Sequence, residues 1–196
     1  MRMADGGVAG LVLAAGAGRR MGGPKALLRL SPCGPSLVER AIDRLHAAGV
    51  GEVHVVVGSA AASVTVHAEH AGGVVVEATD WDEGMGASLR RGLEVLDSTD
   101  AEAVLLMLVD LPDVSSDVHV RLLASAGGDL TDVLVRAAYG GVPGHPVLLG
   151  REHWKGVCES AVGDHGARDY LASQQPRLVE CADLATGRDI DRPADV

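Results

Sequence analysis

Residues 103–109, AVLLMLV, form an uninterrupted apolar run that ends just before Asp110 and Pro112. A run of this length without polar alternation is typical of a strand that is buried on both faces, as in a parallel sheet covered by helices. Further apolar runs predict strands at residues 8–15, 53–57, 74–78, 133–138 and 178–181, and a short strand after the loop that begins at residue 140.

Segments with helical periodicity lie between these runs. Ser36 and Glu39 have the spacing of a capping box, which predicts a helix from there to Gly49. Other helices are expected at residues 88–96, 116–126, 152–160 and 167–174. Alternating strands and helices predict a three-layer α/β/α sandwich with a Rossmann-like, mostly parallel sheet, and a single domain over residues 1–196. The chain contains no Phe, so its core must consist mainly of Val, Leu, Ala and Ile.

Charge and cysteine content exclude several classes of protein. The net charge of −10 argues against a surface that holds DNA or RNA through phosphate contacts. Cys33, Cys158 and Cys181 lie far apart, which argues against a disulfide framework or a zinc site. The N-terminal residues do not have the pattern of a signal peptide, and no segment has the length of a membrane span. We therefore expect a cytoplasmic protein that binds neither membranes nor nucleic acids.

The loop after the first predicted strand, GAGRRMGGPK at residues 16–25, combines glycines with Arg19, Arg20 and Lys25. Bare backbone N–H groups beside cationic side chains make an anion site, whereas a simple turn would need the glycines alone. Ligands of open α/β sheets bind beyond the carboxyl ends of the strands, where this loop and Asp110 are both expected. The sequence therefore predicts a phosphate site at this edge.

Two common phosphate loops do not fit. The dinucleotide fingerprint requires Gly or Ala where this chain has Met21, which argues against a nicotinamide-dependent reductase. The P-loop requires GK[ST], but Pro24 precedes Lys25 here, and Ala26 replaces the hydroxyl residue that would bind magnesium.

The stretch LAAGAGRRMGGPK at residues 13–25 resembles the LAAGxGxRMGxPK signature of the MobA-like nucleotidyltransferases. Within that family it is most similar to molybdenum cofactor cytidylyltransferases, because the guanylyl relatives tend to have LAGG where this chain has Ala14 and Ala15. Further matches follow in family order: GMGASL at 84–89, VDLP at 109–112, GHPV at 144–147, GDHGAR at 163–168 and DIDRPAD at 189–195.

This resemblance implies the nucleotide-diphospho-sugar transferase type of fold and a magnesium-dependent reaction. A nucleoside monophosphate would pass from a nucleoside triphosphate, CTP above all, to a phosphorylated acceptor such as molybdopterin, with release of pyrophosphate. Molybdoenzyme maturation proteins would be further partners. Alternatives are a guanylyltransferase that makes molybdopterin guanine dinucleotide, a sugar-phosphate nucleotidyltransferase, and a non-catalytic nucleotide-binding relative.

The resemblance also implies residue roles. The expected catalytic residues are Lys25, Asp110 and Arg20, and the expected metal ligands are Asp110 and Asp191. Acceptor contacts are expected from His145, Asp164 and Arg168. The expected nucleotide-binding residues are Leu13, Ala14, Ala15, Gly16, Gly18, Arg19, Lys25 and Ser88.

Structural roles compete with some of these assignments. Ser88 would otherwise be a helix N-cap, and His145 a structural histidine. Asp110 would otherwise cap a turn at a strand end, and Asp191 would belong to a solvated acidic tail.

Overall fold

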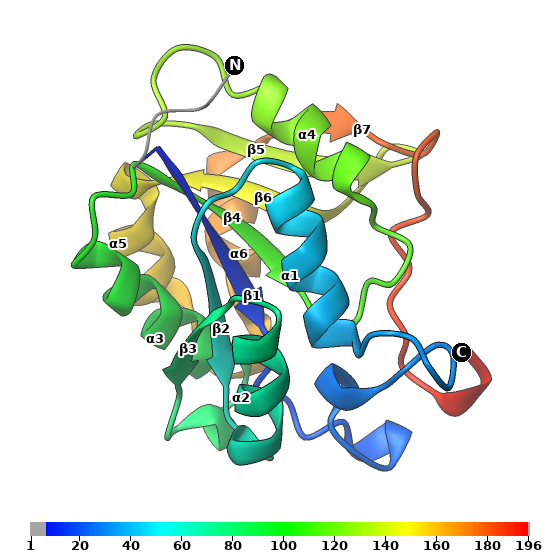
Figure 1. Cartoon of the computed structure of the whole chain (residues 1–196). Coiled ribbons are helices and arrows are strands. Elements are labelled where there is room, and N and C mark those ends of the chain that lie inside the picture. The colour runs from blue at the N-terminus through cyan, green and yellow to red at the C-terminus, as the bar shows by residue number, and fades with distance from the viewer. Residues whose placement is uncertain (1–6, 196) are drawn as a thin grey trace.

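The computed structural model describes residues 7–195. The prediction that the N-terminus carries no signal peptide concerns residues that lie mostly outside this described part. One sheet has the strand order β3-β2-β1-β4-β6-β5-β7, with β4 in the middle (Figure 1). The strands are β1 (Val8–Leu13), β2 (Val53–Val57), β3 (Val74–Glu77), β4 (Ala103–Leu108), β5 (Leu134–Tyr139), β6 (Val142–Gly150) and β7 (Arg177–Glu180). Among these strands β6 alone pairs antiparallel with its neighbours, which confirms the predicted mostly parallel sheet.

Helices cover both faces of the sheet and complete the predicted three layers (Figure 1). One face packs against α1 (Leu37–Ala47), α2 (Ala61–His70) and α4 (Ser116–Ala124). The other face packs against α3 (Met85–Asp97), α5 (Arg151–Ser160) and α6 (Arg168–Gln174). Among the helices that the structure describes, none is long and apolar enough to cross a membrane.

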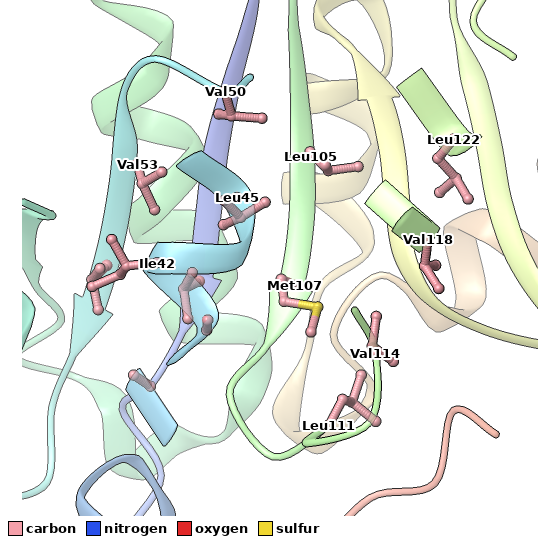
Figure 2. Packing of buried hydrophobic residues seen from close by; sticks show 14 of the residues in the cluster. Ile42, Leu45, Val50, Val53, Leu105, Met107, Leu111, Val114, Val118 and Leu122 are labelled. Carbon is pink, nitrogen blue, oxygen red and sulfur yellow. The ribbon is translucent and has the colours of Figure 1, made fainter. Parts of the chain in front are cut away.

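Aliphatic side chains fill the space between the sheet and the first of these helix layers (Figure 2). Ile42 and Leu45 of α1 pack beside Val53 of β2, while Leu105 and Met107 of β4 face the same layer. All five side chains are at most 1% exposed, so burial of aliphatic surface supplies the packing that aromatic residues often provide.

The register of the two central strands positions the site. β1 and β4 are parallel, with Leu11 beside Leu106 and Leu13 beside Leu108. Their carboxyl ends therefore meet at one edge, and the glycine-rich loop and Asp110 emerge there side by side.

The structure differs from the expected elements in two places. Helix α2 has no predicted counterpart, because its sequence AASVTVHAEH lacks a continuous apolar stripe and its N-cap, Ala60, forms no side-chain cap. The loop expected from residue 140 is largely strand β6, because Val142 and Pro143 pair with β5 across a register shift between Arg136 and Ala138. Strand pairing thus overrides the local turn signal of the Gly and Pro residues.

Candidate active site

The loop after β1 folds back on itself around Gly18. This residue has φ 58°, and a Cβ there would collide with the carbonyl oxygen of Gly23, so only glycine fits without strain. The Gly18 carbonyl accepts hydrogen bonds from the N–H groups of Met21 at 2.8 Å and Gly23 at 3.3 Å. The turn so formed leads through Pro24 into the short 3₁₀ helix Lys25–Leu27, which carries Lys25 back toward the sheet edge.

Lys25 joins two carboxylates that are distant in sequence. Its Nζ lies 2.7 Å from Asp110 Oδ2 and 2.6 Å from Asp191 Oδ1. Arg20 Nη1 lies 3.1 Å from the other oxygen of Asp191. The Lys25 and Asp110 side chains are each 18% exposed, whereas that of Arg20 is 75% exposed, so the Lys25–Asp110 pair is the more shielded contact.

The network shifts the pKa values of its members. Burial disfavours the charged form of Lys25, but hydrogen bonds and charges from Asp110 and Asp191 together raise its pKa above the ordinary value. The hydrogen bond from Lys25 lowers the pKa of Asp191 below its ordinary value, against a smaller effect of burial and with help from the charges of Lys25 and Arg20. Lys25 is therefore an ammonium, and Asp191 a carboxylate, at neutral pH.

Three carboxylates converge beside this lysine. Oxygens of Asp110, Asp189 and Asp191 lie within 4.8 Å of one another. Asp110 Oδ1 is buried and has no hydrogen-bond partner among the residues described, although Oδ2 of the same group bonds Lys25. Magnesium and manganese prefer oxygen ligands, so this donor set and its unpaired buried oxygen fit a hard divalent cation.

A cavity of about 580 Å³ opens above the network. Its lining comes from five parts of the chain that meet at the carboxyl edge of the sheet. Lining residues are Leu13–Arg20, Lys25 and Ala26 of the first loop; Trp81, Asp82, Gly84 and Met85; Leu108–Asp110; and Asp164 with Asp191.

Most of the residues predicted for the triphosphate and the metal therefore meet in one place. Leu13, Ala14, Ala15, Gly16, Gly18, Arg19, Arg20, Lys25, Asp110 and Asp191 all line the cavity. Asp164, predicted on the acceptor side, lines it too. Gly84 allows this approach because it has no side chain. A Cβ there would lie within 2.9 Å of the backbone of Gly163 and of Asp164 Oδ1.

Ser88, His145 and Arg168 are not among the lining residues. Ser88 is 4% exposed within α3, and it is not the N-cap, because this helix begins at Met85 after Gly84. His145 lies on β6, and Arg168 is the first residue of α6.

His145 and Arg168 both lie close enough to Arg136 of β5 for charge interactions with it. Arg136 of β5 donates to the carbonyl of Gly144 at 2.8 Å. Burial lowers the pKa of Arg136, and the charge of Arg168 lowers it further. Burial and the charge of Arg136 lower the pKa of His145 to about 4, so this imidazole is neutral at pH 7.

Sequence reasoning assigned no role to Asp189 and did not consider Arg136. The position of Asp189, two residues before Asp191, was the available signal for a shared carboxylate site, because alternate residues of an extended segment point to the same side. The proximity of Arg136 to His145 depends on the pairing of β5 with β6, for which the local sequence carries no separate signal.

The family model of the MobA-like NTP transferase domain matches residues 10–178. Among solved structures, a homologue of Mycobacterium tuberculosis Rv0371c from Mycobacterium sp. strain JC1 is 29% identical, with a TM-score of 0.81 over 96% of this chain and 92% of that chain. Rv0371c itself, in complex with manganese, is 27% identical, with a TM-score of 0.67 over 89% and 86% of the two chains.

At the level of fold, a nucleotidyl transferase from Methanothermobacter thermautotroptrophicus is 24% identical, with a TM-score of 0.79 over 96% of this chain and 93% of that chain. Among curated proteins, none matches the chain.

Proposed function

Because this chain belongs to the MobA-like NTP transferase domain family, we propose that it transfers a nucleoside monophosphate from a nucleoside triphosphate to a phosphorylated acceptor. The observation that carries this proposal is the bridge of Lys25 between Asp110 and Asp191 beneath a glycine-rich loop. A phosphate oxygen of the acceptor would form a bond to the α-phosphorus. The bond from that phosphorus to the β-phosphate bridging oxygen would break, and pyrophosphate would leave.

The protein groups serve this reaction by positioning and by charge neutralisation. The backbone N–H groups of residues 14–20 would bind the triphosphate. Lys25 would neutralise the negative charge that grows on departing pyrophosphate, because its raised pKa keeps it protonated at neutral pH. Arg20, which is largely exposed, would approach the outer phosphates.

Asp110 and Asp191, with Asp189 beside them, would hold a magnesium ion. When bound, such an ion supplies Lewis-acid polarisation of phosphate oxygens and neutralises part of their charge. The unpaired buried oxygen of Asp110 supports this assignment, and so does the manganese complex of the similar Rv0371c.

For the acceptor we propose molybdopterin, and for the triphosphate CTP. The CTP assignment rests on Ala14 and Ala15, which match the cytidylyl branch of the family. Asp164 would contact the acceptor directly, because it lines the cavity. Arg168 and the neutral His145 would lie on the side of the sheet that faces the acceptor. Arg136 would add positive charge there for the phosphate of the acceptor.

A turnover panel tests this proposal. Purified protein with magnesium or manganese would be offered CTP, GTP, ATP or UTP with molybdopterin, and released pyrophosphate would be measured. We expect release with CTP and molybdopterin, and little without the acceptor.

The alternatives give different results. Turnover with GTP would indicate the guanylyl reaction, and turnover with a sugar phosphate would indicate the sugar-nucleotide reaction. Tight binding of a triphosphate without any turnover, seen as a rise in melting temperature, would instead indicate a nucleotide-binding relative.

A further inference from the structure

Two of the three clustered carboxylates lie on a segment that crosses the end of the sheet. This segment, residues 181–191, follows β7 at the sheet edge and ends beside Asp110, which follows the central strand β4; we call it the strap. Figure 1 shows it in orange to red along one side of the molecule. The family model ends at residue 178, so the strap lies beyond the matched residues.

The strap is held at several points along its length. At its start, Asp183 forms a two-pronged ion pair with Arg121 of α4, at 2.5 and 2.8 Å. At its end, Ile190 is 3% exposed, and its N–H donates to the Asp110 carbonyl at 2.9 Å. Ile190 is thus anchored between Asp189 and Asp191, the two strap carboxylates.

Between these points Leu184 and Ala185 pack against the core, and the side chain of Asp113 binds the strap by hydrogen bonds. Asp113 Oδ2 accepts hydrogen bonds from the backbone N–H of Thr186 at 2.6 Å and from its hydroxyl at 2.5 Å. Among the described residues, this is the last side-chain tether before the carboxylates. The next residue, Gly187, has φ 66° and packs so closely on Tyr139 that a Cβ would collide with the ring.

Asp113 belongs to the same short loop as Asp110, three residues further along the chain. This loop is itself held, because Arg44 of α1 donates to the carbonyls of Pro112 at 2.6 Å and Leu111 at 3.4 Å. One immobilised loop therefore carries both the first carboxylate and the tether for the segment that carries the other two.

We propose that Asp113 is a positioning residue that sets the distance between Asp110 and the strap carboxylates, and thereby the affinity of the site for a divalent cation. This rests on the proposed function in one respect, the assignment of that carboxylate cluster to a metal. Groups that orient metal ligands typically change metal affinity by roughly 10- to 100-fold when removed. Asp113 would act through the strap, because it is not among the residues that line the cavity.

The experiment compares Asp113→Ala, Asp113→Asn and Asp183→Ala in the full chain. The first removes the tether, the second keeps one neutral acceptor oxygen, and the third is a matched control that breaks an ion pair at the other end of the strap. Hydrogen exchange of the Ile190 amide reports strap docking, and titration with manganese alone reports cation affinity without turnover.

For Asp113→Ala we expect at least roughly tenfold faster exchange at Ile190 and roughly tenfold weaker manganese binding. At saturating metal, kcat should fall less than the apparent metal affinity does. Asp113→Asn should recover part of both losses, and Asp183→Ala should stay within about twofold of the parent protein.

Unchanged exchange and unchanged manganese affinity in Asp113→Ala would overturn the proposal, as would equal losses in Asp183→Ala. If the parent protein binds no manganese, the metal assignment in the proposed function fails. The exchange readout then still decides whether Asp113 docks the strap.

Discussion

At the scale of single residues, the ammonium of Lys25 and a divalent cation would draw on the same two carboxylates, Asp110 and Asp191. In the nucleotide-free protein the lysine already neutralises part of their charge. Once a triphosphate is bound, its phosphates offer the lysine another partner. If the proposed function is correct, the same side chain should oppose cation binding and favour turnover.

Replacement of Lys25 by Met should separate these two effects. We expect turnover to fall by roughly a hundredfold, the scale reported when one charge-stabilising donor is removed from an active site. Manganese affinity of the nucleotide-free protein should instead rise, because two adjacent carboxylates lose their competing cation. Pyrophosphate release and manganese titration measure the two quantities.

The control for this variant is Lys155→Met, which removes a lysine whose ion pair with Glu159 is exposed. Both quantities should stay at parent values there. A decrease in manganese affinity in Lys25→Met would contradict the competition between Lys25 and the cation.

Replacement of Asp110 by Asn should abolish metal-dependent turnover while the fold survives. The substitution keeps the size of the side chain but removes the charge that a hard cation requires. We expect at least a hundredfold loss of kcat/KM, roughly the scale of a lost transition-state contact. Rate assays and melting curves measure activity and folding separately.

Asp132→Asn is a suitable comparison, because the Asp132 side chain is 74% exposed and lies outside the cavity lining. Parent-like activity in Asp110→Asn would refute its assignment as a ligand.

At the scale of secondary-structure elements, helix α1 combines a strong N-terminal cap with a buried apolar face. The backbone N–H of Ser36 donates to Glu39 Oε2 at 2.6 Å, and the N–H of Glu39 donates to Ser36 Oγ at 3.5 Å, which completes the predicted capping box. Helix α4 starts after Ser115, which makes no side-chain cap hydrogen bond. The two serines therefore offer a matched comparison of capping.

Ser36→Ala should lower the free energy of unfolding by about 1 kcal/mol, the usual contribution of an N-cap side chain. Ser115→Ala should have a much smaller effect, because its hydroxyl satisfies no helix N–H. Urea denaturation at pH 7 measures both. Equal losses of unfolding free energy in the two variants would show that the capping hydrogen bond of Ser36 is not the cause of its effect.

The sequence predicted most strands because each buried run is apolar within itself, as in Ala103–Leu108. It also predicted that Lys25 and Asp110 lie at one edge, because strand ends of a parallel sheet share an edge. Asp191 was expected beside them only from the family resemblance. Helix α2 was missed because its sequence has neither a continuous apolar stripe nor a capping side chain. Most of β6 was expected to be loop because its pairing with β5 determines it. The docking of Asp189 and the tether at Asp113 depend on the path of the strap, which no local pattern encodes.

At the scale of the whole molecule, the lowered pKa values of His119 and His145 should make stability depend on pH. His119 of α4 is 0% exposed, and neither ring nitrogen has a hydrogen-bond partner among the described residues. Burial and the charge of Arg44 lower its pKa from 6.5 to about 4. His145 has a similarly lowered pKa of about 4, caused by burial and by Arg136.

The free energy of unfolding should therefore fall as the pH drops from 6.5 toward 4. Over this range the unfolded chain binds protons at both imidazoles, whereas the folded chain keeps them neutral. Each such proton contributes a slope of about 1.4 kcal/mol per pH unit. Urea denaturation at several pH values measures the slope.

His119→Leu should lower the slope of the unfolding free energy against pH by the contribution of one proton, because Leu has a similar volume and no titrating group. A slope in His119→Leu equal to that of the parent protein would contradict the assignment of a neutral buried His119.

The contact between Lys25 and Asp191 joins residues 166 positions apart in sequence. Closing so long a loop carries a large entropic cost, so this pairing should form late in folding, after the sheet has brought its partners near. For the same reason, brief local unfolding should release it before the strands separate. The chain should therefore visit a state that is folded but catalytically incomplete. In this state the glycine-rich loop after β1 keeps its structure, while Asp191 has moved away from Lys25.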